Sequence, residues 1–332
     1  MNLDARIAAF VSLGESIANG LFDHSLDDAI HSACSANPWF TESHVRYALQ
    51  TWSDSLSESA IMRLARSGPA LENVDVLPKT IAIIMAGNLP LAGMHDWLCV
   101  LLSGNKALVK LSANDNVLLP RLNAMLPPAL EQHCTFEEGR LGNFQAVIAT
   151  GSNNTSRYFD YYFGRYPHII RHNRNSLAIL NGNESPDDLQ GLCDDIFLHF
   201  GLGCRSVSKL FVPKGYCFDA LIEASTRYAH FADIHLYRSS LDYHKALMLL
   251  NGEQFVDGGF WMLHVSPSIA APVSIVNYEE YADISEAEQW CRAHAEDLQV
   301  VARSGNFGNA QHPSLTDFAD GVNTMKFLAE IT

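Results

Sequence analysis

Apolar residues recur at roughly helical spacing over the first 75 residues of the chain, as at Leu3, Ile7, Phe10 and Ile17. This period places apolar side chains on one face of a helix, which can then be buried. Pro38 and the Gly68-Pro69 pair interrupt the pattern. We therefore expect an N-terminal helical segment over residues 1–75.

From Thr80 onward, short apolar runs of strand type alternate with helical stretches. The runs are TIAIIMA from Thr80, KALVKL from Lys106 and FQAVIAT from Phe144. Strands separated by helices of this length predict a parallel, doubly wound sheet, in which ligands bind at the carboxyl ends of the strands. The loops GNLP at 87–90 and GSNNTS at 151–156 follow such ends. We predict a cofactor-binding domain over residues 76–166.

A second lobe is predicted to begin near residue 167 with two paired strand-like runs, HIIRHN and SLAILNG. A helix should start at Ser185, because serine caps free amides and the following proline has no amide to lose. The runs SKLFVP, PVSIVNY and LQVVARS supply further strands. We expect a catalytic domain over 167–305 and a C-terminal segment, 306–332, that returns to the cofactor domain. The fold class is then α/β with two Rossmann-type lobes.

The charge balance excludes several partners. Twenty-two basic and 37 acidic residues give a formal charge of -15, which disfavours binding to nucleic acid and to anionic membranes. The apolar stretch from Ile81 is interrupted by Gly87, Pro90 and Asp96, so it does not predict a membrane span. No apolar run follows a basic N-terminal segment toward a cleavage site, and we expect a cytoplasmic protein.

The cysteine and histidine patterns indicate neither disulfides nor a metal. Seven cysteines include no CxxC pair, so reduced thiols are expected. Fourteen histidines include no HExxH motif and no dense cluster with acidic residues. We assign no metal site.

Cys204 is the candidate nucleophile. It lies in HFGLGCRSVSKLFVP between a predicted helix and strand, with two nearby glycines and Arg205 beside it. A tight turn can expose such a thiol, and positive charge favours the reactive thiolate. The alternative is a small buried core residue, which is the commoner state of a free cysteine when only the local sequence is considered.

Three loops offer further candidate site residues. Asn88 in AGNLP could donate its side-chain amide to an oxyanion, a role worth ~2.7–4 kcal/mol in acyl transfer, or it could simply make turn bonds. Lys110 and Ser112 could contact a ribose or phosphate, although a lysine at a strand end is often only solvated. Gly151-Ser152 could offer helix-start amides to an anion.

Taken in order, these segments resemble the aldehyde dehydrogenase superfamily. The matching stretches are GNLPLAGMHDWLCVLLSGNKALVKLS, ATGSNNTSRYF and FGLGCRSVSKLFVP, which together extend from about Pro78 to Pro213. With NPWFT at 37–41 and the late run PSLTDFADGVNTMKFL, the chain resembles more closely the acyl-CoA reductases related to the luminescence fatty-acid reductase (LuxC-like). Beyond Pro213 the resemblance is thinner.

The resemblance implies catalytic roles. Cys204 would be the nucleophile, and Asn88 with the Cys204 amide would form the oxyanion hole. Hydrolytic family members carry a water-activating glutamate, but here RHNRN occupies that place, with Arg171 or His172 nearest to it. A second family glutamate, at a cofactor motif, is replaced around 267–269. Without a base for water, a thiol such as coenzyme A should be the better acyl acceptor.

The resemblance also implies a nicotinamide cofactor. Lys110 and Ser112 would contact its adenosine ribose, and Gly151-Ser152 would lie beside its phosphates. Members that prefer NAD often carry a glutamate three residues after this lysine, where Ala113 stands here. The lack of a carboxylate permits a 2′-phosphate and favours NADP(H) over NAD(H), an inference that Asp115 nearby weakens.

The resulting hypothesis is an NAD(P)H-dependent acyl-CoA reductase that forms an aldehyde through a cysteine-bound acyl-enzyme. Its substrate would be an acyl-CoA, a coenzyme A thioester. Two alternatives stay open: an acyl-phosphate reductase of the same superfamily, and an inactive relative that serves as a binding or scaffold subunit. The sequence leaves assembly into a homo-oligomer open.

Overall fold

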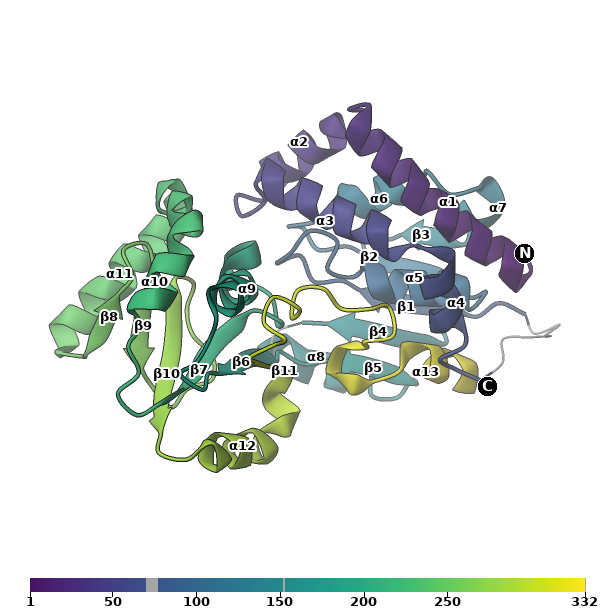
Figure 1. The fold of residues 1–332 in the computed structure, drawn as a ribbon. Coiled ribbons are helices and arrows are strands. Elements are labelled where there is room, and N and C mark those ends of the chain that lie inside the picture. The colour runs from purple at the N-terminus through teal and green to yellow at the C-terminus, as the bar shows by residue number, and fades with distance from the viewer. Residues whose placement is uncertain (70–76, 152, 332) are drawn as a thin grey trace. The chain divides into compact units, whose positions relative to one another are not determined.

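The structure is a computed structural model that describes residues 1–69, 77–151 and 153–331, without the side chains of 153–156. The chain forms two compact units (Figure 1). The first unit comprises Met1–Asn173 together with Ser314–Thr332, and the second comprises Arg174–Pro313. Both contain a largely parallel sheet with helices packed on it, so the prediction of an α/β fold is confirmed.

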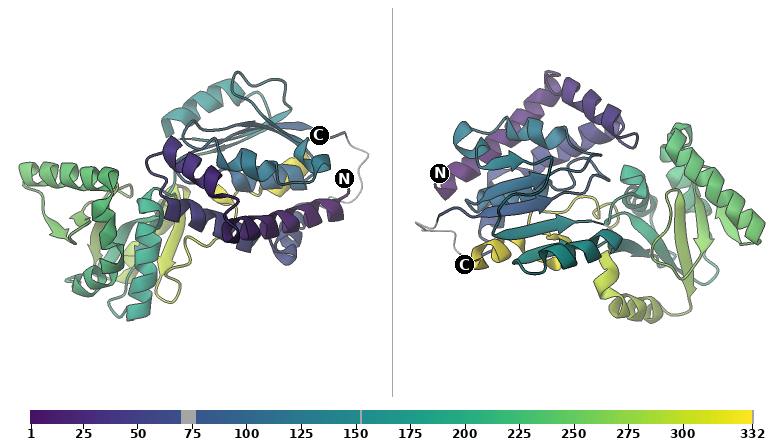
Figure 2. Two further views of the ribbon diagram at one scale, coloured as in Figure 1. Left: turned by 90° about the horizontal axis from the view of Figure 1, so that it is seen from above. Right: turned by 180° about the vertical axis from the view of Figure 1, so that it is seen from behind.

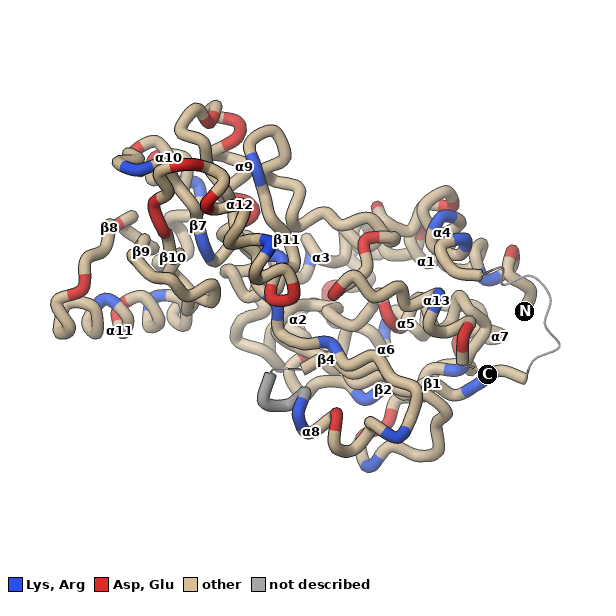
Figure 3. Tube along the Cα trace, turned by 90° about the horizontal axis from the view of Figure 1, so that it is seen from below, with Lys and Arg blue, Asp and Glu red and all other residues tan. Residues whose placement is uncertain are grey.

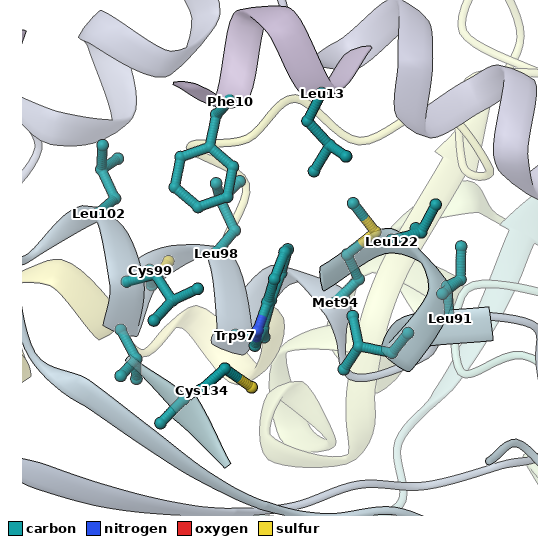
Figure 4. Packing of buried hydrophobic residues seen from close by; sticks show 14 of the residues in the cluster. Phe10, Leu13, Leu91, Met94, Trp97, Leu98, Cys99, Leu102, Leu122 and Cys134 are labelled. Carbon is teal, nitrogen blue, oxygen red and sulfur yellow. The ribbon is translucent and has the colours of Figure 1, made fainter. Parts of the chain in front are cut away.

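The N-terminal helical segment of the first unit is confirmed. It contains α1 (Leu3–Phe22), α2 (Asp27–Ala36), α3 (Glu42–Ser55) and α4 (Glu58–Ala65). The side chains of Asn2, Thr41 and Ser57 accept backbone amides at the starts of α1, α3 and α4. The buried face of α1 packs against the core. There the rings of Phe10 and Trp97 pack edge to face, with 5.7 Å between their centroids (Figure 4).

The sheet of the first unit has the strand order β3-β2-β1-β4-β5, and every neighbouring pair is parallel. Its strands are β1 (Thr80–Ile84), β2 (Lys106–Lys110), β3 (Cys134–Phe136), β4 (Ala146–Thr150) and β5 (His168–Arg171). Because successive strand residues face opposite ways, Ile81 and Ile83 pack in the same core as α1, whereas Ala82 packs with Phe159 and Phe163 of α8 (Asn153–Phe163). Figure 2 shows α8 on the opposite side of the sheet from α1.

The other helices of the first unit are α5 (Met94–Leu102), α6 (Leu118–Asn123), α7 (Pro128–Glu131) and α13 (Thr324–Glu330). Residues 124–127 separate α6 from α7, and Pro128 is the first residue of α7. Proline disfavours the helical conformation of the residue before it and cannot donate a backbone hydrogen bond. The late helix α13 packs against α5 and contributes Met325 and Leu328 to the core.

The sheet of the second unit has the order β11-β6-β7-β10-β9-β8 and is parallel except for the β8–β9 pair. Its strands are β6 (Asn175–Ile179), β7 (Val207–Pro213), β8 (Phe255–Asp257), β9 (Met262–Val265), β10 (Ile275–Tyr281) and β11 (Leu298–Arg303). The expected pairing of the runs at 168–173 and 176–182 is wrong. Strand β5 pairs with β4 in the first unit, and β6 pairs with β7 and β11 in the second.

The helices of the second unit are α9 (Pro186–Phe197), α10 (Asp219–Ser225), α11 (His235–Asn251) and α12 (Ile284–Ala293). The predicted helix start at Ser185 is confirmed, since its side chain accepts the Asp188 amide and the Asp188 carboxylate accepts the Ser185 amide. Helix α9 leads directly to the segment that carries Cys204.

Candidate active site

The carboxyl ends of three neighbouring strands place most of the candidate cofactor residues along one edge of the first sheet. Ile84 at the end of β1 lies level with Lys110 of β2 and with Ala149 of β4. The loops that carry Asn88, Ser112 and Gly151 leave from this edge. Since β1 lies between β2 and β4, the chain order reverses here, which is where doubly wound sheets bind ligands.

The Asn88 loop, residues 87–91, is seated closely against the loop after β2. A Cβ placed on Gly87 would lie only 2.6 Å from the Ser112 Cβ, so only glycine allows this approach. Asn88 itself is exposed. At the far end of the loop, the Asp115 carboxylate accepts the Leu91 amide at 2.7 Å. Burial raises the pKa of Asp115 to about 6, and the hydrogen bond from Leu91 opposes that shift.

Lys110 and Ser112 each have a partner within the first unit. The Lys110 ammonium donates to the Gly139 carbonyl at 2.7 Å, and the Ser112 hydroxyl oxygen accepts the Asn114 amide at 3.2 Å. An ammonium has three donors, so this lysine can still offer protons to a further group. Gly151 follows β4 and is partly exposed, whereas Ser152 lies outside the described residues.

Cys204 belongs to the second unit and lies in an exposed turn just before β7. The three residues His199, Phe200 and Gly201 all have positive φ angles of 58°, 58° and 73°. This left-handed segment ends the helical run and leads into the turn, and such strain in non-glycine residues often marks functional sites. The Ser176 hydroxyl donates to the Cys204 carbonyl at 2.9 Å and so fixes the turn to β6.

The other thiols show how unusual that exposure is. Burial raises the pKa of Cys134 and Cys193 to about 12, and burial with the nearby Asp96 charge raises that of Cys99 well above its ordinary value. These thiols are therefore inert at neutral pH. Cys204 and Cys217 are exposed, so the alternative of a buried core residue is wrong for Cys204.

A loop that the sequence analysis did not single out packs on the Cys204 turn. Asp195, fully buried on α9, accepts the amides of Gly308 and Ala310 at 2.7 and 3.0 Å. Arg205 donates to the Ala310 carbonyl at 3.3 Å, and Gln311 donates to the Ser206 hydroxyl at 3.3 Å. Burial raises the pKa of Asp195 to about 6. A carboxylate within the apolar face of a predicted helix was the available signal for this residue.

The segment 267–269, where the family's second glutamate is replaced, lies beside the first residues of β7. Ser208 stands four residues after Cys204 in the chain. Its hydroxyl donates to the Ile269 carbonyl at 2.8 Å. The Asn277 side chain donates to the carbonyls of Ser268 and Ala270, both at 3.0 Å. Side-chain hydrogen bonds to main-chain carbonyls therefore hold this segment against β7 and β10.

Arg171 has a structural partner. Its guanidinium makes two hydrogen bonds to the Asp96 carboxylate, at 2.6 and 3.1 Å, and donates to Thr324 and to the Ala319 carbonyl. Burial acts to lower the pKa of Arg171, but the facing Asp96 charge outweighs it and the pKa is raised. The Arg171 guanidinium is therefore buried within the first unit and is held by these partners.

Lys and Arg positions are spread over many elements of both units (Figure 3). Within the described ranges, no three His, Cys, Asp or Glu side chains gather as metal ligands. Among these same residues, no helix combines the length and apolarity needed to cross a bilayer.

Solved aldehyde dehydrogenases share this fold. A NAD-dependent benzaldehyde dehydrogenase from Corynebacterium glutamicum matches with a TM-score of 0.65 and 13% identity, over 94% of this chain and 83% of its own. A 1-pyrroline-5-carboxylate dehydrogenase from Thermus, solved with bound NAD, gives 0.64 and 14% over 99% and 80%. Aldehyde dehydrogenase 21 from Physcomitrella patens, solved with the reaction product succinate, gives 0.65 and 12% over 100% and 84%.

By sequence, the chain matches no protein-family model and no curated protein significantly. The structural matches nevertheless extend over nearly the whole chain. The protein therefore has the aldehyde dehydrogenase fold, as the resemblance of its sequence motifs implied.

Proposed function

We propose that this protein is a cysteine-dependent oxidoreductase that uses NAD(P)H to reduce an acyl-CoA thioester to an aldehyde. The observation that carries the proposal is the exposed Cys204 in the turn before β7, just after the left-handed residues 199–201, within an aldehyde dehydrogenase fold. The resemblance to LuxC-like acyl-CoA reductases supports the choice of substrate. Of NADH and NADPH, we favour NADPH as the cofactor.

In the proposed reaction the Cys204 thiolate attacks the carbonyl carbon of the thioester. The new carbon–sulfur bond forms a tetrahedral oxyanion, which collapses as the bond to the coenzyme A sulfur breaks. Coenzyme A leaves as a thiolate that takes a proton from water. A bound nicotinamide would supply one hydride to the acyl carbon. The resulting thiohemiacetal anion would collapse to the aldehyde as its carbon–sulfur bond breaks, which regenerates the Cys204 thiolate.

Asn88 is proposed to donate its side-chain amide to the oxyanion together with the Cys204 backbone amide. A preorganised donor of this kind accelerates acyl transfer because its dipole is already aimed at the developing charge. Support comes from the exposure of Asn88 and from the close seating of its loop on Ser112. The role of Asn88 can be measured separately from that of Cys204.

The cofactor is proposed to bind along the carboxyl edge of the first sheet. Lys110 and Ser112 would contact its adenosine ribose, and Gly151-Ser152 would lie beside its phosphates. The position of this edge at the reversal of strand order supports the proposal. Ala113 is exposed, and the Asp115 carboxylate is buried and accepts Leu91, so neither offers an exposed carboxylate that would repel a 2′-phosphate. This arrangement supports NADPH.

Hydrolysis of the acyl-enzyme is proposed to be slow. Arg171 and His172 are nearest to the place of the hydrolytic glutamate, and no carboxylate occurs in the RHNRN run. The Arg171 side chain is engaged by Asp96, Thr324 and Ala319. A guanidinium in a buried ion pair cannot remove a proton from water. Slow hydrolysis would leave the acyl-enzyme to be reduced to the aldehyde or to exchange with coenzyme A.

Cofactor oxidation by the purified protein tests the proposal. We expect NADPH consumption that depends on acyl-CoA and is abolished in Cys204→Ser, whereas Cys217→Ser, which changes the other exposed thiol, retains it. Equal rates in Cys204→Ser and wild type would disprove the mechanism. Faster turnover with an acyl phosphate would favour the acyl-phosphate alternative. Absence of turnover with both substrates, together with equal alkylation of Cys204 and Cys217 by iodoacetamide, would favour a binding or scaffold subunit.

A further inference from the structure

Two buried polar side chains hold the opposite ends of the Asn88 loop. Asn37 follows α2 in the NPWFT segment and is 4% exposed. Its side-chain nitrogen donates to the Gly87 carbonyl at 3.2 Å, and its side-chain oxygen accepts the Trp39 amide at 2.9 Å. At the other end, Asp115 accepts the Leu91 amide. The NPWFT segment thus acquires a structural role directly beside Asn88.

Asp115 is an unusual acceptor for a backbone amide, because its carboxylate is buried. The residue is 9% exposed, and only its Oδ2 atom has a hydrogen-bond partner among the described residues, while the buried Oδ1 has none. Burying a carboxylate that makes a single hydrogen bond is unfavourable for folding. A buried polar atom of this kind calls for a reason other than stability.

The backbone at Leu91 supplies that reason. Leu91 has a φ angle of 60°, in the left-handed region that leucine rarely adopts. Its side chain is 3% exposed and packs in the core with Met94 and Leu122 (Figure 4). Such a conformation persists only where the surroundings impose it. The core holds the Leu91 side chain, and Asp115 holds its amide.

We propose that Asp115 is a positioning residue that fixes the Asn88 loop for oxyanion binding, with Asn37 fixing the loop's other end. This inference rests on the proposed function, because the role of Asn88 as a donor belongs to it. Displacement of a catalytic donor by about 1 Å can reduce turnover by two orders of magnitude. A carboxylate is suited to this task because its charge strengthens the hydrogen bond from the Leu91 amide.

Hydrogen–deuterium exchange tests the structural part without any activity. Asp115→Asn keeps an oxygen that can accept the Leu91 amide, whereas Asp115→Leu has similar volume and no acceptor. We expect exchange at Leu91 to remain slow in Asp115→Asn and to rise at least about tenfold in Asp115→Leu, since the amide loses its partner. The control Asp23→Leu removes a carboxylate that accepts the Ser25 amide at 2.9 Å on another turn, and should leave Leu91 unchanged.

Kinetics test the positioning role. Asp115→Leu should lower kcat by roughly 10- to 100-fold, within the ~10²–10³-fold range for loss of an oxyanion donor, and should change KM for acyl-CoA by less than about threefold. Asp115→Asn should stay within about threefold of wild type in both quantities. The rate at which iodoacetamide alkylates Cys204 requires no oxyanion hole and should not change.

A double-mutant cycle with Asn88→Ala decides whether Asp115 acts through Asn88. In the Asn88→Ala background, Asp115→Leu should reduce kcat little further, because the group that it positions is already absent. Fully additive effects, or unchanged exchange at Leu91 in Asp115→Leu, would overturn the role of Asp115. A wild-type protein without thioester-dependent turnover would instead overturn the proposed function, and the exchange result at Leu91 would still be read independently.

If Asp115→Leu does not fold, Asn37→Leu allows the same comparison of kcat with and without Asn88→Ala. It removes the donor to Gly87 at the other end of the loop, so kcat should fall and the effect should again disappear in the Asn88→Ala background. Wild-type kcat in Asn37→Leu, or a loss that adds to that of Asn88→Ala, would contradict the proposal.

Discussion

Arg171 and Asp96 form a buried ion pair whose side chains are 6% and 8% exposed. The pair joins β5 to α5, and Arg171 also donates to Thr324 and to the Ala319 carbonyl in the C-terminal segment. A buried pair stabilises a fold little compared with apolar residues of the same volume, but removal of one partner leaves an uncompensated charge. The pair therefore links three parts of the first unit that are distant in the sequence.

Arg171→Met should lower the free energy of unfolding by about 3–5 kcal/mol, because it leaves the Asp96 carboxylate buried and unpaired. The double variant Asp96→Leu/Arg171→Met should recover part of that loss. Arg238→Met, which breaks an exposed pair with Asp242, should cost no more than about 1 kcal/mol. Urea unfolding measures all three, and equal losses in Arg171→Met and Arg238→Met would contradict the assignment.

The pKa of Asp115 predicts a pH dependence of stability. Burial raises this pKa from an ordinary 3.8 to about 6, so between these values the folded chain keeps a proton that the unfolded chain has released. The contribution of Asp115 to the free energy of unfolding is therefore at its full value below pH ~4 and is lost as the pH rises through ~6. Relative to wild type, Asp115→Asn should therefore gain stability from about pH 4 to about pH 6, and the difference should level off at higher pH.

Urea unfolding of wild type and Asp115→Asn at several pH values measures this difference. Asp23 serves as a control whose pH dependence of stability has the opposite sign. Hydrogen bonds from the backbone and side chain of Ser25 lower its pKa. Its contribution is lost as the pH falls, so Asp23→Asn should lose stability relative to wild type as the pH rises. A constant difference between wild type and Asp115→Asn across the range would rule out a raised pKa.

Ala113 tests the cofactor assignment. Ala113→Glu places a carboxylate three residues after Lys110, where it should repel a 2′-phosphate. The Kd for NADPH should rise at least about tenfold, and the Kd for NADH should fall or stay unchanged. Asn114→Glu, at the next exposed position, controls for added negative charge. Quenching of intrinsic fluorescence measures the affinities, and equal weakening by both variants would argue against a phosphate beside Ala113.

At the scale of elements, the sequence predicted those helix starts and strands that are determined by neighbouring residues in the chain. The capping box at Ser185 and the apolar runs of β1, β2, β4, β6 and β7 were visible because caps and buried strands have compositional signatures. Strands β3 and β8 have three residues each, too few to show a period, and β9 has four. The partner of β5 was wrong because pairing depends on tertiary packing.

Ser185→Ala tests the start of α9. Loss of the capping box removes acceptors for amides at the helix start and should cost about 1 kcal/mol of unfolding free energy. Ser239→Ala, at an exposed position inside α11, should change stability by less than about 0.5 kcal/mol. Thermal or urea unfolding distinguishes the two, and an equally small effect at Ser185 would show that the box is not stabilising.

The candidate site could be predicted only in part for a related reason. Cys204, Asn88 and Lys110 stand in motifs whose residue types carry their own chemical meaning. Asp115 and Asp195 act on backbone amides that are 24 and more than 100 residues away in the chain, so only the folded structure shows their partners. The same holds for Arg171, which is 75 residues from Asp96.

At the scale of the whole molecule, the two units divide the proposed chemistry. The first carries Asn88 and the candidate cofactor residues along one edge of a parallel sheet, and the second carries Cys204 in an exposed turn that follows a left-handed segment. The fold is that of aldehyde dehydrogenases. The account therefore depends on whether Cys204 accepts an acyl group.

Intact-mass measurement after incubation with acyl-CoA, in the absence of reduced cofactor, tests this most directly. We predict one adduct with the mass of the acyl group, located by peptide mapping on Cys204 and absent from Cys204→Ser. Addition of NADPH should remove the adduct and release an aldehyde. An unmodified Cys204 across acyl-CoAs of increasing chain length, or equal acylation of Cys217, would contradict the proposed mechanism.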